Sequence, residues 1–455
     1  MQALTDTLLP IVNTINGYLS DYILVFLLMG AGLYFSFKTK FVQVRCFGEG
    51  MKRVFGNLTL SGKKHESGMS SFQALATAIA AQVGTGNIVG ASGAILTGGP
   101  GAIFWMWIIA FFGMATIYAE AVLAQKTRVK NEDGQYLGGP VYYIRTAFQG
   151  SLGKFLAAFF AIAIILALGF TGCMVQSNSI GSTFSTAFGV PSWIVGIILV
   201  AVCGFIFVGG VQRLASVTEK LVPIMAAVFL LGGVVVLIAR IQYVPATFGM
   251  IFKYAFQPQA IIGGGFGYAI KTAISQGAKR GLFSNEAGMG STPHAHAVAK
   301  VKYPAQQGFV AIVGVFVDTF IVLNMTAFVI FVTNSIDGST TGIALTQKAF
   351  ESGLGSFGIT FVAICLFFFA FSTIIGWYFF GEQNIKYLFG TKGTTPYRLI
   401  VMGFIVLGSV LQVDLVWELA DMFNGLMVLP NLIALIGLSK IVSMALRDYD
   451  ANNPR

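Results

Sequence analysis

The sequence predicts an all-α polytopic membrane protein with eleven transmembrane helices. Ten of them form two five-helix repeats of opposite orientation, and one is an extra N-terminal helix. Three observations predict this fold. Of its 455 residues, 56% are hydrophobic and 10% charged, with a mean hydropathy of +0.78, a composition typical of membrane-spanning chains. Apolar runs long enough to cross a bilayer recur along the chain. Two of these runs, five spans apart, are interrupted by glycines and polar residues.

The longest apolar runs place the eleven spans. We expect them at 17–37, 71–97, 101–125, 155–181, 192–212, 216–239, 263–302, 306–333, 357–381, 397–413 and 418–440. No hinge linker divides the chain, so we expect a single transmembrane domain over 1–455. Within it, we expect an extra helix and loop, a first repeat, a second repeat and a tail, at 1–65, 66–240, 241–443 and 444–455.

The basic residues predict the orientation of these spans. Six loops on one side hold 22 of the 28 Lys and Arg residues, at 38–64, 126–154, 213–220, 300–302, 386–398 and 440–455. The loops on the other side hold only three, and three more fall inside the seventh span: Arg240, Lys253, Lys348, Lys271, Lys279 and Arg280. Because basic loops stay in the cytoplasm, we expect a plasma-membrane (prokaryotic inner-membrane) protein with its N-terminus outside and its C-terminus in the cytoplasm. The basic cytoplasmic loops then explain the net charge of +10, and this charge does not indicate nucleic-acid binding.

The second span is weakest as a helix near the middle of the membrane. Gln82, Gly84, Thr85, Gly86 and Asn87 interrupt its apolar residues. Glycine weakens a helix, and Asn and Thr side chains compete for its backbone groups. A half-helix that starts near Asn87 would direct free N–H groups at an anion, and the carbonyls before the break would be free for a cation. The alternative is that the glycines only permit close helix packing.

The seventh span repeats this pattern in the opposite direction. Polar residues and glycines gather between Lys279 and Ser291, which predicts a discontinuous helix with halves at 263–279 and 292–302. Glu286 in this break either meets a ligand or freed N–H groups, or pairs with Lys279 or Arg280. We interpret the nearby histidines as packing or solvated residues, because no third metal ligand stands close in the sequence; they are His294 and His296.

Polar side chains interrupt two further spans. Gln176 and Asn178 in the fourth span either hydrogen-bond a neighbouring helix or line a pocket. Asp318 in the eighth span either binds a cation or belongs to a buried hydrogen-bond network. Beyond the eighth span, the polar loop 334–356 is expected to hold a short amphipathic helix near 343–350 that packs on the outer face or takes part in gating.

The ninth span carries two adjacent hydroxyls at mid-depth, Ser372 and Thr373. They either bond back to their own helix or offer hard oxygen ligands to Na⁺. Trp377 lies one turn further on roughly the same face as Thr373, where it either forms the floor of a small pocket or packs.

With these residues identified, the chain resembles the alanine/glycine:cation symporter family over nearly its whole length. The stretches that carry the resemblance lie at 84–88, 98–107, 118–121, 138–140, 279–288, 372–373 and 376–377. The resemblance implies a LeuT-like fold of the amino acid-polyamine-organocation superfamily, with ten core helices plus one. It also implies Na⁺-driven import of small neutral amino acids such as alanine and glycine by alternating access, with no cofactor besides the co-transported Na⁺.

The resemblance also implies the site residues. Thr85 and Gly86 would hold the substrate carboxylate through backbone N–H groups. Four side chains would line the pocket: Gln176, Phe283, Ser284 and Trp377. A Na⁺ ion would lie between carbonyls and hydroxyls of the first and eighth core helices: Ala80, Val83, Ser372 and Thr373. Asn87, Glu286 and Asp318 are left with a coupling or a structural role.

One departure from the family pattern concerns substrate size. Ser275 and Gln276 stand where bulkier residues are expected, and Cys173 where an amide is expected. A broader carrier for serine or glutamine, or a proton-coupled one, is therefore the alternative. A channel would need a continuous polar lining, and a membrane enzyme would need a catalytic constellation that three histidines and scattered hydroxyls do not suggest. The expected partners are the amino acid, Na⁺ and the bilayer, without an obligatory protein partner.

Overall fold

The computed structural model describes residues 2–56, 69–131, 134–257, 266–338, 340, 342–411 and 414–453. Within them the chain is helical apart from a two-stranded antiparallel hairpin of β1 (Val129–Lys130) and β2 (Tyr136–Leu137). Three basic residues of the predicted cytoplasmic loops, Lys63, Lys64 and Arg455, lie outside the described residues. The start of the predicted span 263–302 and the end of the span 397–413 also lie outside them.

The first half of the chain forms thirteen α-helices with short π- or 3-10-helical segments (η) between some of them. They are α1 (Gln2–Tyr18), η1 (Leu19–Leu24), α2 (Val25–Lys38), α3 (Val42–Arg45), α4 (Phe47–Phe55), α5 (Ser71–Gln82), η2 (Gly86–Gly90), α6 (Ala91–Gly98), α7 (Gly101–Thr127), α8 (Pro140–Ala147), α9 (Gly150–Ile164), η3 (Ile165–Gly172), α10 (Cys173–Phe188), α11 (Ser192–Val208), α12 (Gly210–Ala239), η4 (Ile241–Tyr243) and α13 (Val244–Phe256), counted over the described residues.

The second half continues with α14 (Phe266–Asn285), α15 (Pro293–Val298), α16 (Pro304–Val315), η5 (Phe316–Leu323), α17 (Asn324–Val332), α18 (Ile343–Leu354), α19 (Phe357–Phe389), η6 (Thr391–Gly393), α20 (Thr394–Val410), α21 (Asp414–Gly437) and α22 (Ser439–Asn452). The short helix expected near 343–350 is confirmed as α18. The helices α3, α4, α8, α13 and α22 were not expected from the apolar runs, and the first helix begins at Gln2 rather than near the predicted 17.

By length and composition, eight helices of the described chain could each cross a membrane, or nine if one bent pair is a single span. They are Thr5–Lys38, Gly101–Thr127, Gly150–Phe188, Gly210–Ala239, Pro304–Val332, Phe357–Phe389, Thr391–Val410 and Asp414–Gly437. Each coincides for most of its apolar length with one predicted span, although Gly210–Ala239 also includes the last three residues of the predicted span 192–212, and α11 is apolar but shorter. The chain is therefore an integral membrane protein, while the count of eleven spans and the inverted repeat remain predictions.

The second predicted span is broken in its middle. α5 starts at a capping box made by Ser70 and Gln73, and it ends at Gln82 because Val83 is extended, with φ −80° and ψ 93°. The helix resumes from Gly86 as η2 and α6, bent by 47° from α5. Three residues, 83–85, therefore separate two half-helices.

The seventh predicted span is broken later than predicted. α14 runs without interruption through Lys279 and Arg280 to Asn285, so the predicted end of the first half at 279 is wrong. Glu286 then has φ +58° and Gly288 φ +90°, and the chain turns over 286–292 before the short α15. The second half is also shorter than the predicted 292–302.

Ion pairs explain why α14 stays helical through its two basic residues. Lys279 Nζ lies 3.6 Å from Asp21 Oδ1 of η1, and Arg280 Nη1 lies 3.4 Å from Asp421 Oδ2 of α21. The two cations are thus compensated by neighbouring helices. They do not pair with Glu286, so the ion pair that was one of the alternatives for that residue is excluded.

The two broken helices are joined at one end by backbone hydrogen bonds. Met69, before α5, forms a parallel bridge with Ala299, after α15. The Met69 N–H donates to Val298 O at 3.3 Å, and the Lys300 N–H donates to Met69 O at 3.1 Å. Gln125 of α7 donates to Ala299 O at 2.9 Å, which fixes this junction to the rest of the bundle.

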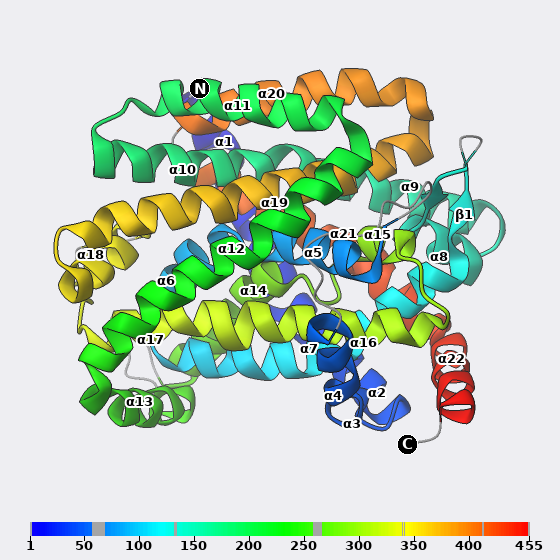
Figure 1. Ribbon diagram of the computed structural model, residues 1–455, viewed down its shortest axis with the longest axis horizontal. Coiled ribbons are helices and arrows are strands. Elements are labelled where there is room, and N and C mark those ends of the chain that lie inside the picture. Colours follow the sequence, from blue (N-terminus) through cyan, green and yellow to red (C-terminus); the bar gives the residue numbers. More distant parts are fainter. Residues whose placement is uncertain are drawn as a thin grey trace.

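The helices pack in layers around the broken pair. Figure 1 shows α10, α11 and α20 along one side, α7 and α16 along the other, and α5, α14 and α19 between them. α19 contacts both α10 and α5, while α7 contacts both α14 and α16. The breaks therefore lie in the interior of the bundle.

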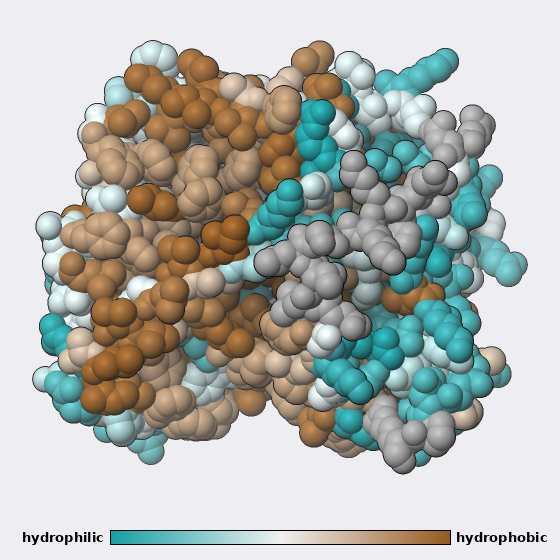
Figure 2. Space-filling model, viewed as in Figure 1, coloured by the Kyte–Doolittle hydropathy of each residue, from teal (hydrophilic) through white to brown (hydrophobic). Residues whose placement is uncertain are grey.

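Hydrophobic and hydrophilic surface residues gather at different ends of the bundle. Figure 2 shows hydrophobic residues over the left and centre of the molecule and hydrophilic residues at its right end. At that end Figure 1 places the β-hairpin, α8, α22 and the C-terminus, whereas α13 and α18 lie at the opposite end. Segments predicted to share the cytoplasmic side are thus gathered together.

Candidate binding site

Side chains replace part of the missing helical hydrogen bonding at the first break. The Gly84 N–H donates to Asn87 Oδ1 at 2.9 Å, and the Thr85 N–H donates to Gln176 Oε1 of α10 at 3.2 Å. The Gln176 side chain therefore faces the break from α10, and the Asn87 side chain stabilises the break from the start of the second half-helix.

Three buried polar atoms beside this break have no hydrogen-bond partner among the described residues. They are Thr85 Oγ1, Gln176 Nε2 and Gln82 Oε1. Thr85 and Gln176 are 0% exposed and Gln82 is 2% exposed. Buried polar groups without partners are rare because leaving them unpaired costs about 1–3 kcal/mol each. Since a hydroxyl and an amide nitrogen can both donate, the pair Thr85 and Gln176 suits an anionic ligand.

Gly86 brings the two breaks into direct contact. A Cβ on Gly86 would lie 3.0 Å from Ser284 Cα and 3.3 Å from Phe283 Cδ1, both on the last turn of α14. Because glycine lacks this atom, the backbone around Gly86 approaches α14 closely. The predicted pocket residues Phe283 and Ser284 therefore lie against the predicted carboxylate cradle.

The predicted Na⁺ ligands converge where α5 ends. Ser372 Oγ lies 3.1 Å from Ala80 O, and Thr373 Oγ1 lies 3.0 Å from Ala80 O and 3.3 Å from Val83 O. Both hydroxyls also reach Phe369 O of their own helix, at 2.9 and 3.0 Å. Two carbonyls and two hydroxyls thus form one group of hard oxygens, buried from solvent.

Trp377 forms a wall beside the second break. Its indole N–H donates to Glu286 Oε1 at 2.6 Å, and its ring meets Phe283 edge-on with centroids 5.5 Å apart. On another side lies Gly172, where a Cβ would approach Trp377 Cζ3 to 2.6 Å. Ser291 donates to the second carboxylate oxygen of Glu286, so Glu286 holds the ring and the turn after α14 together.

Asp318 on η5 connects the two breaks. Asn87 Nδ2 donates to Asp318 Oδ1 at 2.6 Å from the first break. Ser284 Oγ donates to Oδ1 at 3.0 Å and to Oδ2 at 2.9 Å from the end of α14. Thr319 Oγ1 adds a bond to Oδ2 at 2.8 Å. The carboxylate is 0% exposed.

Two further polar residues support the breaks and were not predicted as site residues. Gln82 Nε2 donates to Asn285 O at 2.6 Å and so joins the ends of α5 and α14. Glu120 of α7 accepts from the Gly288 N–H at 3.1 Å and from Asn431 Nδ2 at 2.7 Å. The signal for Glu120 was present in the sequence, since it is a lone carboxylate within the apolar third span.

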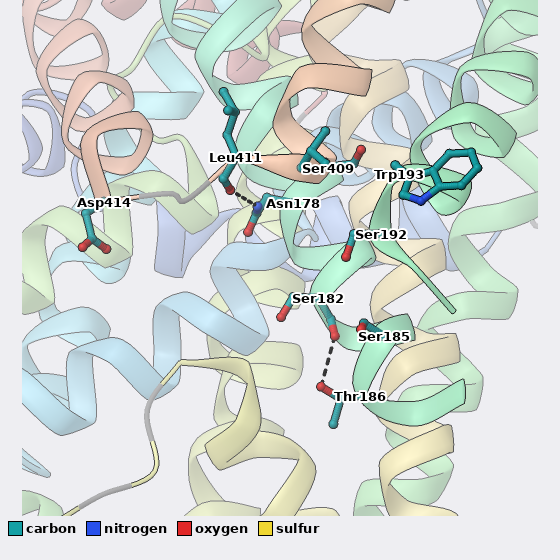
Figure 3. A pocket seen from close by; sticks show the side chains of 10 residues that line it. Asn178, Ser182, Ser185, Thr186, Ser192, Trp193, Ser409, Leu411 and Asp414 are labelled. Atoms are coloured by element: carbon teal, nitrogen blue, oxygen red, sulfur yellow. Dashed lines mark hydrogen bonds between the residues drawn. The ribbon is translucent and has the colours of Figure 1, made fainter. Parts of the chain in front are cut away.

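The described residues also line a cavity of about 620 Å³ at a distance from the breaks. Figure 3 shows Asn178 and several hydroxyl side chains around it, at the ends of α10 and α20 and the start of α11. Asn178 Nδ2 donates to Gly408 O at 2.9 Å and to Leu411 O at 2.8 Å. Asn178 thus serves interhelical bonding and lines this cavity, whereas Gln176 faces the break.

Ser275 and Gln276, two of the three residues that concerned substrate size, do not adjoin the predicted pocket. Ser275 donates to Asp21 of η1, and the Cβ of Gln276 lies 3.1 Å from the position of a Cβ on Gly98. At about 1.5 Å per helical residue, Ser275 is about 12 Å along α14 from Phe283. These two residues therefore provide no argument for a larger pocket.

Comparison with known proteins identifies related sequences over nearly the full length. The model of the sodium:alanine symporter family matches residues 5–455. The sodium/alanine symporter AgcS of Methanococcus maripaludis is 41% identical, over 95% of each chain. A Bacillus subtilis protein named "Probable sodium/glutamine symporter GlnT" is 42% identical, over 96% of this chain and 90% of its own.

Among solved structures, that of MhsT in complex with L-phenylalanine superposes with a TM-score of 0.59. It covers 84% of this chain and 97% of its own at 14% sequence identity. This similarity concerns the fold, and it confirms the LeuT-like architecture that the sequence resemblance implied.

Proposed function

The chain belongs to the sodium:alanine symporter family, and we propose that it imports small neutral amino acids, alanine and glycine foremost, together with Na⁺. As a member of this family, and in a bundle with several membrane-spanning helices, it is a transporter and not an enzyme. The proposal concerns what it carries, which ion drives it and which residues bind both.

One observation carries the proposed carboxylate site. Thr85 Oγ1 and Gln176 Nε2 are buried and unpartnered among the described residues. Thr85 directly precedes Gly86, and its N–H donates to Gln176 Oε1 at 3.2 Å. Together with the N–H groups at the start of η2 and the positive end of the following half-helix, they offer donors to a carboxylate. The substrate ammonium would bind the carbonyls of Phe283 and Ser284 in the last turn of α14. Their helical donors are engaged elsewhere, because the Ala287 N–H donates to Asn285 Oδ1 and the Gly288 N–H donates to Glu120.

The proposed Na⁺ site consists of Ala80 O, Val83 O and the hydroxyls of Ser372 and Thr373. All are hard oxygens, which suit an alkali cation better than a soft metal. Na⁺ between them would hold α5 against α19 before the amino acid binds.

The proposed transport cycle follows from the connection that Na⁺ makes between α5 and α19. Na⁺ binding from outside joins α5 to α19 and favours an outward-open state, and the zwitterion then closes the two breaks over both ligands. The membrane potential contributes about 2.3 kcal/mol per charge per 100 mV to inward movement. Each ligand must raise the affinity for the other by the same factor.

Phe283, Ser284 and Trp377 are proposed to limit the substrate side chain. The rings of Phe283 and Trp377 are held edge to face, and Gly172 and Glu286 fix Trp377 from two other sides. We expect a rigid wall of this kind to admit a substrate side chain the size of a hydrogen or methyl group and to exclude a long one.

Uptake of radiolabelled alanine into proteoliposomes tests the proposal. An inward Na⁺ gradient should accumulate alanine, and excess glycine should compete more strongly than serine or glutamine. Accumulation driven by a proton gradient without Na⁺, or stronger competition by glutamine, would support the alternative carriers instead. Gly86→Leu should abolish alanine binding in a folded protein, since its side chain would collide with Ser284; normal uptake would contradict the carboxylate placement.

A further inference from the structure

Two carbonyls in the last turn of α14, those of Phe283 and Ser284, receive no hydrogen bond from the described residues. These residues are 3% and 0% exposed. The carbonyls on either side of them are satisfied, since those of Leu282 and Asn285 accept hydrogen bonds at 2.9 and 2.6 Å. A buried carbonyl without a donor is costly, so the two adjacent carbonyls call for a ligand with several donors.

The N–H groups that would reach these carbonyls in a continuing helix belong to Ala287 and Gly288, four residues on. Side chains accept both of them instead. The Ala287 N–H donates to Asn285 Oδ1 at 3.0 Å, and the Gly288 N–H donates to Glu120 Oε2 of α7 at 3.1 Å. Asn285 thus keeps the first of the two carbonyls free, and Glu120 keeps the second one free.

Glu120 is held in place for this contact by two other helices. It is 0% exposed, and Asn431 Nδ2 of α21 donates to its other oxygen at 2.7 Å and to Gly288 O at 2.9 Å. Tyr143 Oη of α8 orients the Asn431 amide through a hydrogen bond of 2.5 Å to Oδ1. Gly288 has φ +90°, a conformation open to glycine, and this turn presents its N–H to α7. Three helices therefore fix one acceptor at the second break.

The polarity of the two breaks is complementary to a zwitterion. The first break presents free donors and the positive end of a half-helix, whereas the second presents two free carbonyls at the negative end of α14. The two breaks are in contact, because a Cβ on Gly86 would lie 3.0 Å from Ser284 Cα. An ammonium has three donors and no acceptor, so it matches the second break as a carboxylate matches the first.

Resting on the proposed function, we propose that Glu120 is a positioning residue for the substrate ammonium, with Asn285 as its counterpart. By accepting the Gly288 N–H, Glu120 prevents α14 from adding a turn that would occupy the Ser284 carbonyl. It acts through the backbone and does not contact the substrate. The substrate class that this arrangement selects is an α-amino acid with a free ammonium group, as opposed to the α-hydroxy acid of the same shape.

Binding of alanine and of L-lactate to the purified protein at saturating Na⁺ tests this role, because lactate carries a hydroxyl in place of the ammonium. Glu120→Leu frees the Gly288 N–H to bond to Ser284 O. Alanine should then lose at least about tenfold in affinity, as expected for one hydrogen bond to a charged group, while the affinity for lactate stays within about twofold. Na⁺-dependent thermal stabilisation without amino acid should persist, which shows that the variant is folded.

Two further variants separate this role from general stability. Glu120→Gln keeps an oxygen for the Gly288 N–H and should retain most of the preference for alanine over lactate. Glu382→Leu removes another buried carboxylate, which pairs with Lys386 at 3.5 Å on α19, and should leave that preference unchanged. Equal losses for alanine and lactate in Glu120→Leu would assign Glu120 a structural role only and overturn the proposal, as would the same loss of preference in Glu120→Gln.

Asn285 provides an independent pair of variants, which decides the question if Glu120→Leu does not fold. Asn285→Ala frees the Ala287 N–H to bond to Phe283 O and should lose preference for alanine over lactate. Asn285→Ser keeps a hydroxyl that can accept the N–H two residues on, and it should retain the preference. An unchanged preference in Asn285→Ala overturns the proposal. If the proposed function itself fails, the wild-type protein shows no Na⁺-dependent alanine binding at all, which differs from alanine binding that the variants leave intact.

Discussion

Thr373 shows how tightly individual residues are constrained where α5 meets α19. Its hydroxyl lies 3.0 Å from Ala80 O and 3.3 Å from Val83 O. A Cβ on Gly84 would come within 2.3 Å of the same oxygen. The backbone of Ala80, Val83 and Gly84 therefore surrounds the hydroxyl of Thr373.

Removal of this hydroxyl should weaken Na⁺ dependence more than alanine binding. We expect Thr373→Ala to raise the Na⁺ concentration for half-maximal uptake about tenfold, the loss of about 1.4 kcal/mol. Alanine affinity at saturating Na⁺ should change little. The measurement is alanine uptake against Na⁺ concentration in proteoliposomes, with Thr373→Ser as the control that keeps the hydroxyl. An unchanged Na⁺ curve in Thr373→Ala would remove this residue from the ion site.

The elements of the bundle differ in how far the sequence predicts them. The first break was predictable because its causes are local: Gly84, Gly86 and Asn87 stand within the break itself. The second was displaced because Lys279 and Arg280 are neutralised by residues far away in the chain, on η1 and α21. The sequence around Lys279 and Arg280 does not show those partners, because they are distant in the chain.

The same distinction applies to the site and to the smaller helices. Ser372 and Thr373 were identifiable as hydroxyls in an apolar span, but their approach to Ala80 O depends on how α19 packs against α5. The short helices α8, α13 and α22 escaped prediction because hydropathy detects membrane spans rather than helices at their edges. Asp318 was identifiable as an ionisable residue, whereas two of its three side-chain partners, Asn87 and Ser284, come from segments that only the fold brings together.

The contact between α5 and α19 gives a prediction for whole helices. A Cβ on Gly376 would lie 2.8 Å from Ala81 Cβ and 3.0 Å from Ala81 Cα. We expect Gly376→Ala to push the two helices apart by a few tenths of an ångström and to lower apparent Na⁺ affinity several-fold, although every oxygen ligand remains. The measurement is Na⁺-dependent thermal stabilisation of the purified protein.

Gly403→Ala in α20 is the matched control, because a Cβ there meets nothing within 4 Å. It should leave Na⁺-dependent stabilisation unchanged. Equal responses of the Gly376 and Gly403 variants would show that the distance between α5 and α19 does not matter for the ion.

At the scale of the whole molecule, the arrangement of surface and loops agrees with the predicted sidedness of the segments. The hairpin, α8 and α22 are gathered at one end, and α13 and α18 at the other (Figure 1). The hydrophilic end in Figure 2 coincides with the former group. Which end faces the cytoplasm is a prediction from the basic loops.

Cysteine labelling tests this orientation. In intact cells, an impermeant maleimide should label Lys348→Cys on α18, whereas Arg447→Cys on α22 should react only after permeabilisation. The four native cysteines are buried, so they should add little background. Labelling of Arg447→Cys in intact cells, with Lys348→Cys protected, would reverse the proposed orientation.

The bridge between Met69 and Ala299 has a mechanical consequence. It fastens the entrance of one broken helix to the exit of the other through two backbone hydrogen bonds, which do not depend on side-chain identity. The two half-helices that meet at this junction are therefore held together, and we propose that they move together during transport. We propose that release of the amino acid on this side is then a single concerted movement of both broken helices.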